Sequence, residues 1–225
     1  MTIEKGANWG TEGFVQAVRT SRSDKELSQV VAGGTGDVQV QGGDTWIALG
    51  RPEAVQPPCR SLQLPFDAIE VIVETERWVA FSSVVIRQPW TRGGWLRGDV
   101  WVVSVTGIYR GRHLTPRAHP NDGLLDVIHF DPAMSGRQRL TAWKRSLTGD
   151  HLPHRHLVVR RVTSADVSST RRLDVFVDGH RVGSAQSVRL GILADHWTLS
   201  IPSATSPREP SHEHLESDDE ERGGT

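Results

Sequence analysis

Short apolar segments alternate with turn residues along most of the chain, from Leu62 onward. The segments are rich in Val, Ile and aromatic residues, which are common in strands. They cover residues 68–74, 78–86, 100–108, 123–130, 156–162, 173–179, 181–185, 187–193 and 196–202. Eight or nine strands in series favour an all-β sandwich or barrel. The pattern therefore predicts a mainly β fold.

Two short stretches have a helical pattern instead. Residues 23–32 can begin with Ser23 or Asp24 as the N-cap, and residues 135–147 can begin with Ser135. The apolar positions at helical spacing are Leu27, Val30 and Val31 in the first stretch and Leu140, Trp143 and Leu147 in the second. The second predicted helix interrupts the series of strands.

Changes in composition divide the chain into three parts. A Gly-rich segment and a Pro-containing connector place a boundary between residues 1–58 and the predicted sandwich at residues 59–202. Residues 203–225 contain seven acidic residues against two basic ones and few apolar residues, so they cannot bury enough surface to offset the entropy cost of ordering. We therefore expect an acidic, disordered tail.

The remaining composition argues against several classes of protein. No run of about 18 apolar residues occurs, and the first ten residues lack a secretory signal pattern, so we expect a cytoplasmic protein. Outside the acidic tail, residues 1–202 have 24 basic and 20 acidic residues, and this modest net charge of +4 is spread along the chain, which argues against a nucleic-acid partner. The single cysteine, Cys59, has no second cysteine for a disulfide or a zinc site.

Three short motifs follow one another in the predicted sandwich. Residues 116–125 read P-R-A-H-P-N-D-G-L-L, Gly149 and His151 follow the second helix, and residues 178–180 read D-G-H. In order and spacing they resemble the motifs of the bacterial diacylglycerol kinase and YegS-like lipid kinase family, over roughly residues 62–202. The resemblance implies a C-terminal β-sandwich related to that of NAD kinases, preceded here by a small α/β remnant of a nucleotide-binding domain.

The remnant lacks the features that bind ATP in this family. Residues 42–52, G-G-D-T-W-I-A-L-G-R-P, resemble the segment that leads out of the nucleotide-binding domain, but only about forty residues precede them. A complete domain would end in a G-G-D-G-T loop that holds the ATP phosphates. The G-G-T-G sequence at residues 33–36 is not framed by the strand and helix that a phosphate loop requires. We therefore expect no ATP site.

The loop at residues 116–125 carries a metal expectation through the resemblance. In the family it holds a structural magnesium ion, which corresponds here to the Asp122 carboxylate and the main-chain carbonyls of His119 and Leu124. Mg²⁺ prefers oxygen ligands of this kind. The alternative is a plain turn, in which Asp122 accepts from backbone amides and Gly123 supplies a positive φ. Both remain open.

The D-G-H sequence raises the question of catalysis. In the family, a Glu at the third position accepts the proton of the lipid hydroxyl, and His180 stands there in this chain. Histidine is a competent base near neutral pH. An Asp-Gly pair between apolar segments also predicts a hairpin turn, which would leave His180 in solvent. Because phosphoryl transfer depends on positioning ATP, neither Asp178 nor His180 is assigned a catalytic role.

Two further clusters are candidates for binding. His151, His154 and His156 have a spacing that could suit a metal ion, but Pro153 argues against a helix and favours a loop entering a strand. A Gly-rich loop carries Trp90, Arg92, Trp95 and Arg97, a composition suited to a membrane interface. An ordinary surface hairpin is the alternative for that loop.

The sequence therefore predicts a non-catalytic relative of the lipid kinases. It would bind a membrane lipid or a protein partner through the sandwich, with peripheral contact to a membrane surface. The alternative is half of a lipid kinase, completed by a separate nucleotide-binding protein or by homodimerisation.

Overall fold

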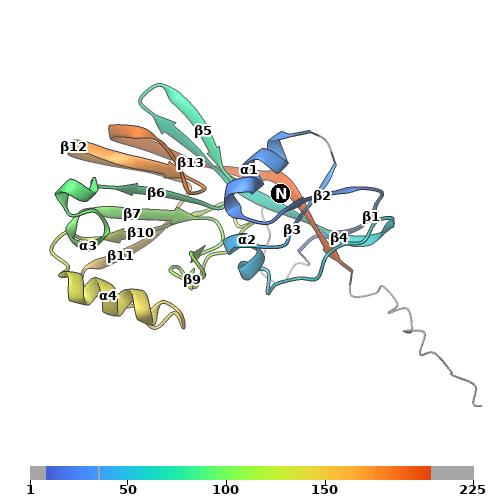
Figure 1. Cartoon of the computed structure of the whole chain (residues 1–225), viewed down its shortest axis with the longest axis horizontal. Helices are drawn as coiled ribbons and strands as arrows, with labels where there is room; N and C mark the ends of the chain where they lie inside the picture. The colour runs from blue at the N-terminus through green and yellow to red at the C-terminus, as the bar shows by residue number, and fades with distance from the viewer. Residues whose placement is uncertain (1–8, 35, 204–225) are drawn as a thin grey trace, which may run out of the picture.

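The computed structural model of the chain describes residues 9–34 and 36–203 (Figure 1). The strands are β1 (Thr11–Val15), β2 (Val18–Ser21), β3 (Asp37–Val40), β4 (Cys59–Val73), β5 (Glu76–Ala80), β6 (Ser83–Arg87), β7 (Val100–Ser104), β8 (Ile108–Tyr109), β9 (Arg112–His113), β10 (Leu125–Phe130), β11 (Leu157–Val162), β12 (Ser164–Val177) and β13 (His180–Pro202). The helices are α1 (Asp24–Ala32), α2 (Gly43–Ala48), α3 (Gly94–Arg97), α4 (Gly136–Arg145) and the 3₁₀ helix η1 (Trp90–Arg92). The predicted acidic tail lies, apart from its first residue, outside the described residues, so its disorder stays a prediction.

Eleven of these strands form one large sheet, in the order β1-β4-β13-β12-β6-β7-β10-β11. Strand β5 also pairs with β4, and β3 joins β2 to β13. Most of the pairs are antiparallel, whereas β2–β3 and β3–β13 are parallel. Strands β8 and β9 form a separate two-stranded sheet.

The large sheet folds over and encloses a core between its two halves. Ile69 and Val71 of β4 share one apolar cluster with Leu125 and Val127 of β10, although four strands separate β4 from β10 in the sheet order. A second cluster lies on the other face, where Ile128 of β10 packs with residues of α4. This arrangement confirms the predicted mainly β sandwich with a few short helices.

The hairpin predicted at the D-G-H sequence is present between β12 and β13. Val177 pairs with His180, which leaves Asp178 and Gly179 as a two-residue loop. Both loop residues have positive φ, 45° at Asp178 and 81° at Gly179, as a type I′ turn requires. The three segments predicted after the turn are one strand, β13, which is 23 residues long.

A small α/β layer precedes the sandwich. Strands β2 and β3 are parallel and flank α1, as in a βαβ unit. Ser23 caps α1 by accepting a hydrogen bond from the Glu26 amide, and Leu27 on its inner face is fully buried. Leu27 packs with Phe66 of β4 and Leu199 of β13. The predicted α/β remnant is therefore seated on extensions of the two long sandwich strands.

Helix α4 corresponds to the second predicted helix. Its apolar spacing predicted a buried face at Leu140, Trp143 and Leu147, but the structure buries a different face. Ser135 caps it in a capping box with Gln138. The buried residues of the helix are Arg139 and Ala142, whereas Leu140 is 54% exposed. None of the helices among the described residues has the length and hydrophobicity of a membrane span.

Candidate functional site

The Asp178 carboxylate braces the turn between β12 and β13. It accepts hydrogen bonds from the backbone amides of Phe81 (2.8 Å), Ser82 (2.9 Å) and Ser83 (2.9 Å), and the residue is only 2% exposed. Burial raises the pKa of the Asp178 carboxyl to about 7, and the three amides oppose that rise. Because Phe81 and Ser82 connect β5 to β6 and Ser83 begins β6, these hydrogen bonds attach the β12–β13 turn to that connection.

His180 is exposed on the other side of the same turn, as the first residue of β13. Its ring has no hydrogen-bond or ion-pair partner among the residues that the structure describes. A general base needs a partner that orients it and a proton within reach. Asp178 and His180 are therefore close in sequence, but the structure does not arrange them as a catalytic pair.

Two further carboxylates link α1 to α2 and α2 to the sandwich. Asp24 accepts from the backbone amides of Asp44 (2.6 Å) and Thr45 (3.3 Å). Asp44 in turn accepts from the amides of Arg110 and Gly111, both at 2.7 Å. Burial, together with the nearby charge of Asp24, raises the pKa of Asp44, and the amide bonds lower it. Like Asp178, both side chains hold backbone in place.

The loop with the predicted magnesium ligands forms a turn in which Asp122 is already paired. Its Oδ1 accepts from the Leu124 amide at 3.1 Å, and its Oδ2 forms an ion pair with the guanidinium of Arg161 on β11. Gly123 has the expected positive φ of 70°. The Nδ1 atom of His119 accepts from the Asn121 amide. As placed, these residues do not fit a magnesium ion, because Arg161 holds the carboxylate oxygen that the ion would need.

The histidine cluster is built from hydrogen bonds to backbone. The Nε2–H of His151 donates to the Leu114 carbonyl at 3.0 Å, and burial lowers the pKa of this ring. The Nδ1 atom of His154 accepts from the His156 amide. Within residues 9–34 and 36–203, no group of three or more His, Cys, Asp or Glu residues is arranged to hold a metal ion.

Exposed apolar side chains gather where α3 and η1 meet α4. Trp90 is 60% exposed, Leu96 57% and Leu140 54%. Together they border a cavity of about 280 Å³, which we call the aromatic cavity. Its lining residues are Trp90, Trp95, Leu96, Tyr109, Arg110, Phe130, Arg139, Leu140 and Trp143. Exposed apolar side chains that gather around a cavity mark a binding surface more often than single ones do.

The wall of the aromatic cavity is a stack of rings. Trp95 is stacked on Tyr109, with ring centroids 5.7 Å apart, and also contacts Trp143 at 6.4 Å. Trp90 lies over the buried guanidinium of Arg87 at 5.1 Å, which fixes the position of its ring. Of the predicted lipid-facing residues, Trp90 is therefore exposed at the rim, whereas Trp95 is half-buried in the wall.

Arg92 and Arg97, the other two predicted lipid-facing residues, are exposed beside the aromatic cavity. Their guanidinium groups have no ion-pair partner within the part of the chain that the structure describes. Their segment was predicted as a loop, and the structure gives it two short helices, η1 and α3.

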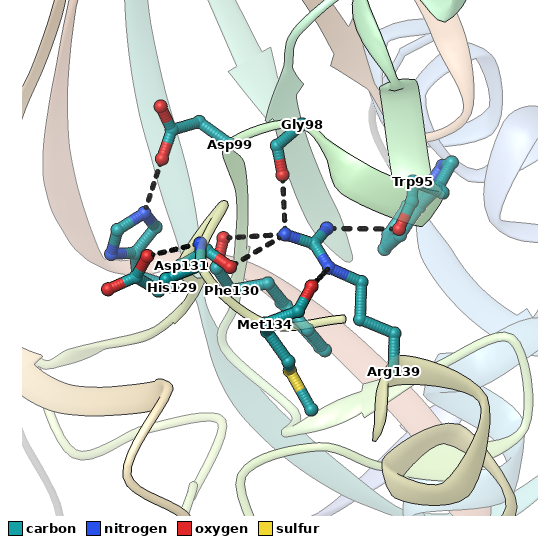
Figure 2. A network of polar contacts seen from close by, with 9 residues as sticks. Trp95, Gly98, Asp99, His129, Phe130, Asp131, Met134 and Arg139 are labelled. Carbon is teal, nitrogen blue, oxygen red and sulfur yellow. Dashed lines mark hydrogen bonds and ion pairs between the residues drawn. The ribbon is translucent and has the colours of Figure 1, made fainter. Parts of the chain in front are cut away.

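Arg139 holds the floor of the aromatic cavity together (Figure 2). This residue of α4 is buried, and its guanidinium donates to five main-chain carbonyls, those of Trp95 (3.0 Å), Gly98 (2.6 Å), Phe130 (3.4 Å), Asp131 (2.8 Å) and Met134 (3.3 Å). Burial lowers the pKa of Arg139, and the charges of Asp99 and Asp131 oppose this. Arg139 therefore fixes the segment that carries α3 against the end of β10.

The larger part of the sandwich matches a known protein family. Residues 94–193 match the family described as the YegS C-terminal NAD kinase beta sandwich-like domain. We call this region the YegS C-terminal domain after the family that it matches. The YegS C-terminal domain contains α3, α4, the Asp122 loop and the Asp178 turn, so all three motifs that suggested the resemblance lie inside it.

Three solved structures from Bacillus anthracis str. Sterne share the fold over 83% of this chain. One is described as a diacylglycerol kinase, with a TM-score of 0.51, 11% identity, and coverage of 83% of this chain and 76% of that one. Two are described only as candidate diacylglycerol kinases, with TM-scores of 0.52 and 0.53, 11% identity, and coverage of 83% of this chain and 78% of those. At this identity the likeness shows the fold alone. No curated protein matches the sequence.

Sequence reasoning missed Arg161, described above, and two further residues that organise these sites. Arg139 lies in a YegS C-terminal domain helix with several other basic residues, which is the usual appearance of a solvent-exposed face. Asp24 was considered only as a helix cap, whereas its carboxylate binds the amides at the start of α2. The one available signal for Asp24 was the G-G-D sequence at residues 42–44, whose exposed amides need an acceptor.

Proposed function

We propose that this protein binds membrane lipid through the aromatic cavity of its YegS C-terminal domain, without phosphorylating the lipid. The observation that carries the proposal is the cluster of Trp90, Leu96 and Leu140, each more than half exposed at the rim of an apolar cavity. Exposing these side chains to water costs free energy that burial in an acyl layer would recover. The indole of Trp90 is also well suited to the headgroup level of a membrane.

Positive charge around the cavity supports an anionic membrane surface as the partner. Arg92 and Arg97 are exposed beside the rim, and Arg110 contributes to the cavity lining. Each basic residue near an anionic bilayer adds roughly 1 kcal/mol to binding, an effect that salt screens. An apolar rim with arginines around it therefore favours vesicles that contain anionic phospholipid over neutral ones.

The contacts at the turn support the non-catalytic part of the proposal. Both oxygens of the Asp178 carboxylate accept from backbone amides, and His180 has no residue to orient it within the described part of the chain. The G-G-T-G sequence at residues 33–36 follows the C-terminal end of α1, where the helix dipole disfavours phosphate. A kinase would need a phosphate site from another chain.

Vesicle co-sedimentation tests the lipid proposal. The Trp90→Ser variant should bind vesicles of phosphatidylcholine and phosphatidylglycerol about tenfold more weakly than the natural chain, because an indole buried in the interface contributes on the order of 1.5 kcal/mol. Trp78→Ser is the matched control, since Trp78 is 38% exposed on β5 and does not line the cavity. Equal loss in both variants, or no binding by the natural chain, would contradict the proposal.

A transfer assay tests the non-catalytic part separately. We expect no transfer of labelled γ-phosphate from ATP to diacylglycerol by the purified chain in the presence of Mg²⁺. Transfer that Asp178→Asn abolishes would instead support the half-kinase alternative. Transfer that appears only when a nucleotide-binding protein is added would support the same alternative, with the ATP site supplied by that protein.

A further inference from the structure

Two carboxylates of the YegS C-terminal domain share a single arginine. Asp126 lies on β10 directly opposite Arg161 on β11, in a register that also pairs Asp126 with Ser104 of β7. The Nε atom of Arg161 is 3.4 Å from Asp126 Oδ1, and its terminal nitrogen forms the ion pair with Asp122 Oδ2. The strand register therefore places one guanidinium between an aspartate of the loop and an aspartate of the strand.

The arginine covers a buried carboxyl group that has no other polar partner among the described residues. Asp126 is 1% exposed, and neither of its carboxylate oxygens has a hydrogen-bond partner among the described residues. Its ion pair with Arg161 is its one polar side-chain contact within that part of the chain. A buried carboxylate without a counter-charge is strongly destabilising, so the position of Arg161 is needed by the fold itself.

We infer that Arg161 supplies, from within the chain, the positive charge that the family resemblance assigns to magnesium, and that it excludes the metal ion from the Asp122 loop. A guanidinium is permanently charged, and its planar set of donors can serve two carboxylates at once. Mg²⁺ would have to displace that group and give up part of its tightly held water to reach Asp122. The Arg161 side chain thus neutralises the Asp122 loop, which needs no metal ion from solution.

Unfolding measured with and without magnesium tests this inference. The natural chain should have the same thermal midpoint in excess Mg²⁺ and in EDTA. Arg161→Met should lower the midpoint by roughly 5 °C, because it leaves Asp126 buried without a counter-charge. Mg²⁺ should restore part of that loss, since the freed Asp122 and Asp126 can then accept the ion. Arg160→Met is the matched control: Arg160 is the exposed neighbour on β11 and has no ion pair in the described part of the chain.

Three results of these measurements would contradict the inference, each at a different step. A midpoint of the natural chain that rises with Mg²⁺ would overturn the inference, because a metal ion would then bind with Arg161 present. A loss in Arg161→Met no larger than that in Arg160→Met would overturn the role of the counter-charge. A loss that Mg²⁺ does not reduce would overturn the claim that the arginine excludes a metal ion.

A double-mutant cycle keeps the inference testable if Arg161→Met does not fold. Asp122→Asn should destabilise the natural chain, and its effect should be smaller when Arg161 is already Lys, which keeps the charge but not the two-sided contact. Additive effects of Asp122→Asn and Arg161→Lys would mean that the two side chains do not act as a pair. Equilibrium dialysis of the natural chain against Mg²⁺ gives a second readout, for which we expect no bound ion.

Discussion

Two buried charged side chains hold backbone segments in place in this sandwich. One is an acceptor at a turn between strands, and the other is a donor beside two helices. At the β12–β13 turn, the carboxylate of Asp178 accepts from three backbone amides. At the α3–α4 end, the guanidinium of Arg139 donates to five backbone carbonyls (Figure 2). Each ion is satisfied by backbone dipoles rather than by an opposite charge.

The difference lies in what surrounds the two braces. Around Asp178 the contacts are internal, and the exposed neighbour is the polar His180. Arg139 holds the carbonyls of Trp95 and Gly98, on either side of Leu96, and the nearby Leu96 and Trp90 expose apolar surface. A rigid support beneath exposed apolar side chains is what a binding surface needs, because it reduces the entropy lost on binding. This difference favours the α3–α4 end as the binding surface that we propose.

Arg139→Met should have the largest effect on this comparison. The substitution leaves five carbonyls without their donor, and we expect a loss of about 3 to 5 kcal/mol in the free energy of unfolding, measured with urea. Vesicle binding should fall as well, because the segment carrying α3 is no longer fixed. Arg137→Met, at an exposed position of the same helix, is the control and should change stability by less than about 0.5 kcal/mol.

Asp178→Asn should have the next largest effect. The amide can still accept from some of the three backbone N–H groups, but its NH₂ faces at least one of them, so we expect a loss of about 1 to 3 kcal/mol. Vesicle binding should stay unchanged, in contrast to Arg139→Met. If Asp178→Asn weakened vesicle binding as much as Arg139→Met does, the proposed separation between the two ends would be wrong.

His151 should make the free energy of unfolding depend on pH. Burial lowers its pKa below the usual 6.5, so the folded protein binds this proton less readily than the unfolded chain does. The contribution is complete above pH 6.5 and is lost as the pH falls from there toward the folded pKa, with a slope of at most about 1.4 kcal/mol per pH unit. Urea unfolding should show a shallower slope in this window for His151→Gln.

Trp90→Ser should have the smallest effect on stability. The side chain is mostly exposed, so we expect a change within about 0.5 kcal/mol in the free energy of unfolding, together with the loss of vesicle binding described above. A large loss of stability would show that Trp90 serves the fold through its contact with Arg87. The urea midpoint and the sedimented fraction, measured on the same preparation, distinguish the two roles.

Local signals in the sequence were enough to predict much of the fold. The Asp-Gly turn and the Ser135 cap depend on short-range chemistry, and both occur as expected. The merging of three predicted segments into β13 was not predictable, because the bulge between Leu193 and Trp197 depends on pairing with β4. Local patterns specify where strands lie more reliably than how far each one continues.

The candidate sites were less predictable, because they depend on contacts between distant residues. Arg161 meets Asp122 across 39 positions of sequence, and Arg139 meets Trp95 across 44. Nothing in the local pattern distinguishes these arginines from the many exposed ones. Trp90 was recognisable, since an aromatic residue among glycines and arginines is unusual in a loop.

Strands β4 and β13 each run through two apolar cores. Their residues Ile69 and Val188 belong to the core of the sandwich, whereas Phe66 and Leu199 belong to the core under α1. Loss of order in one core therefore propagates along two continuous backbones into the other, and the described chain should melt in one cooperative transition. A truncation that removed the segment before β4 would not release an independent sandwich; it would uncover half of the two longest strands and invite aggregation along their exposed edges.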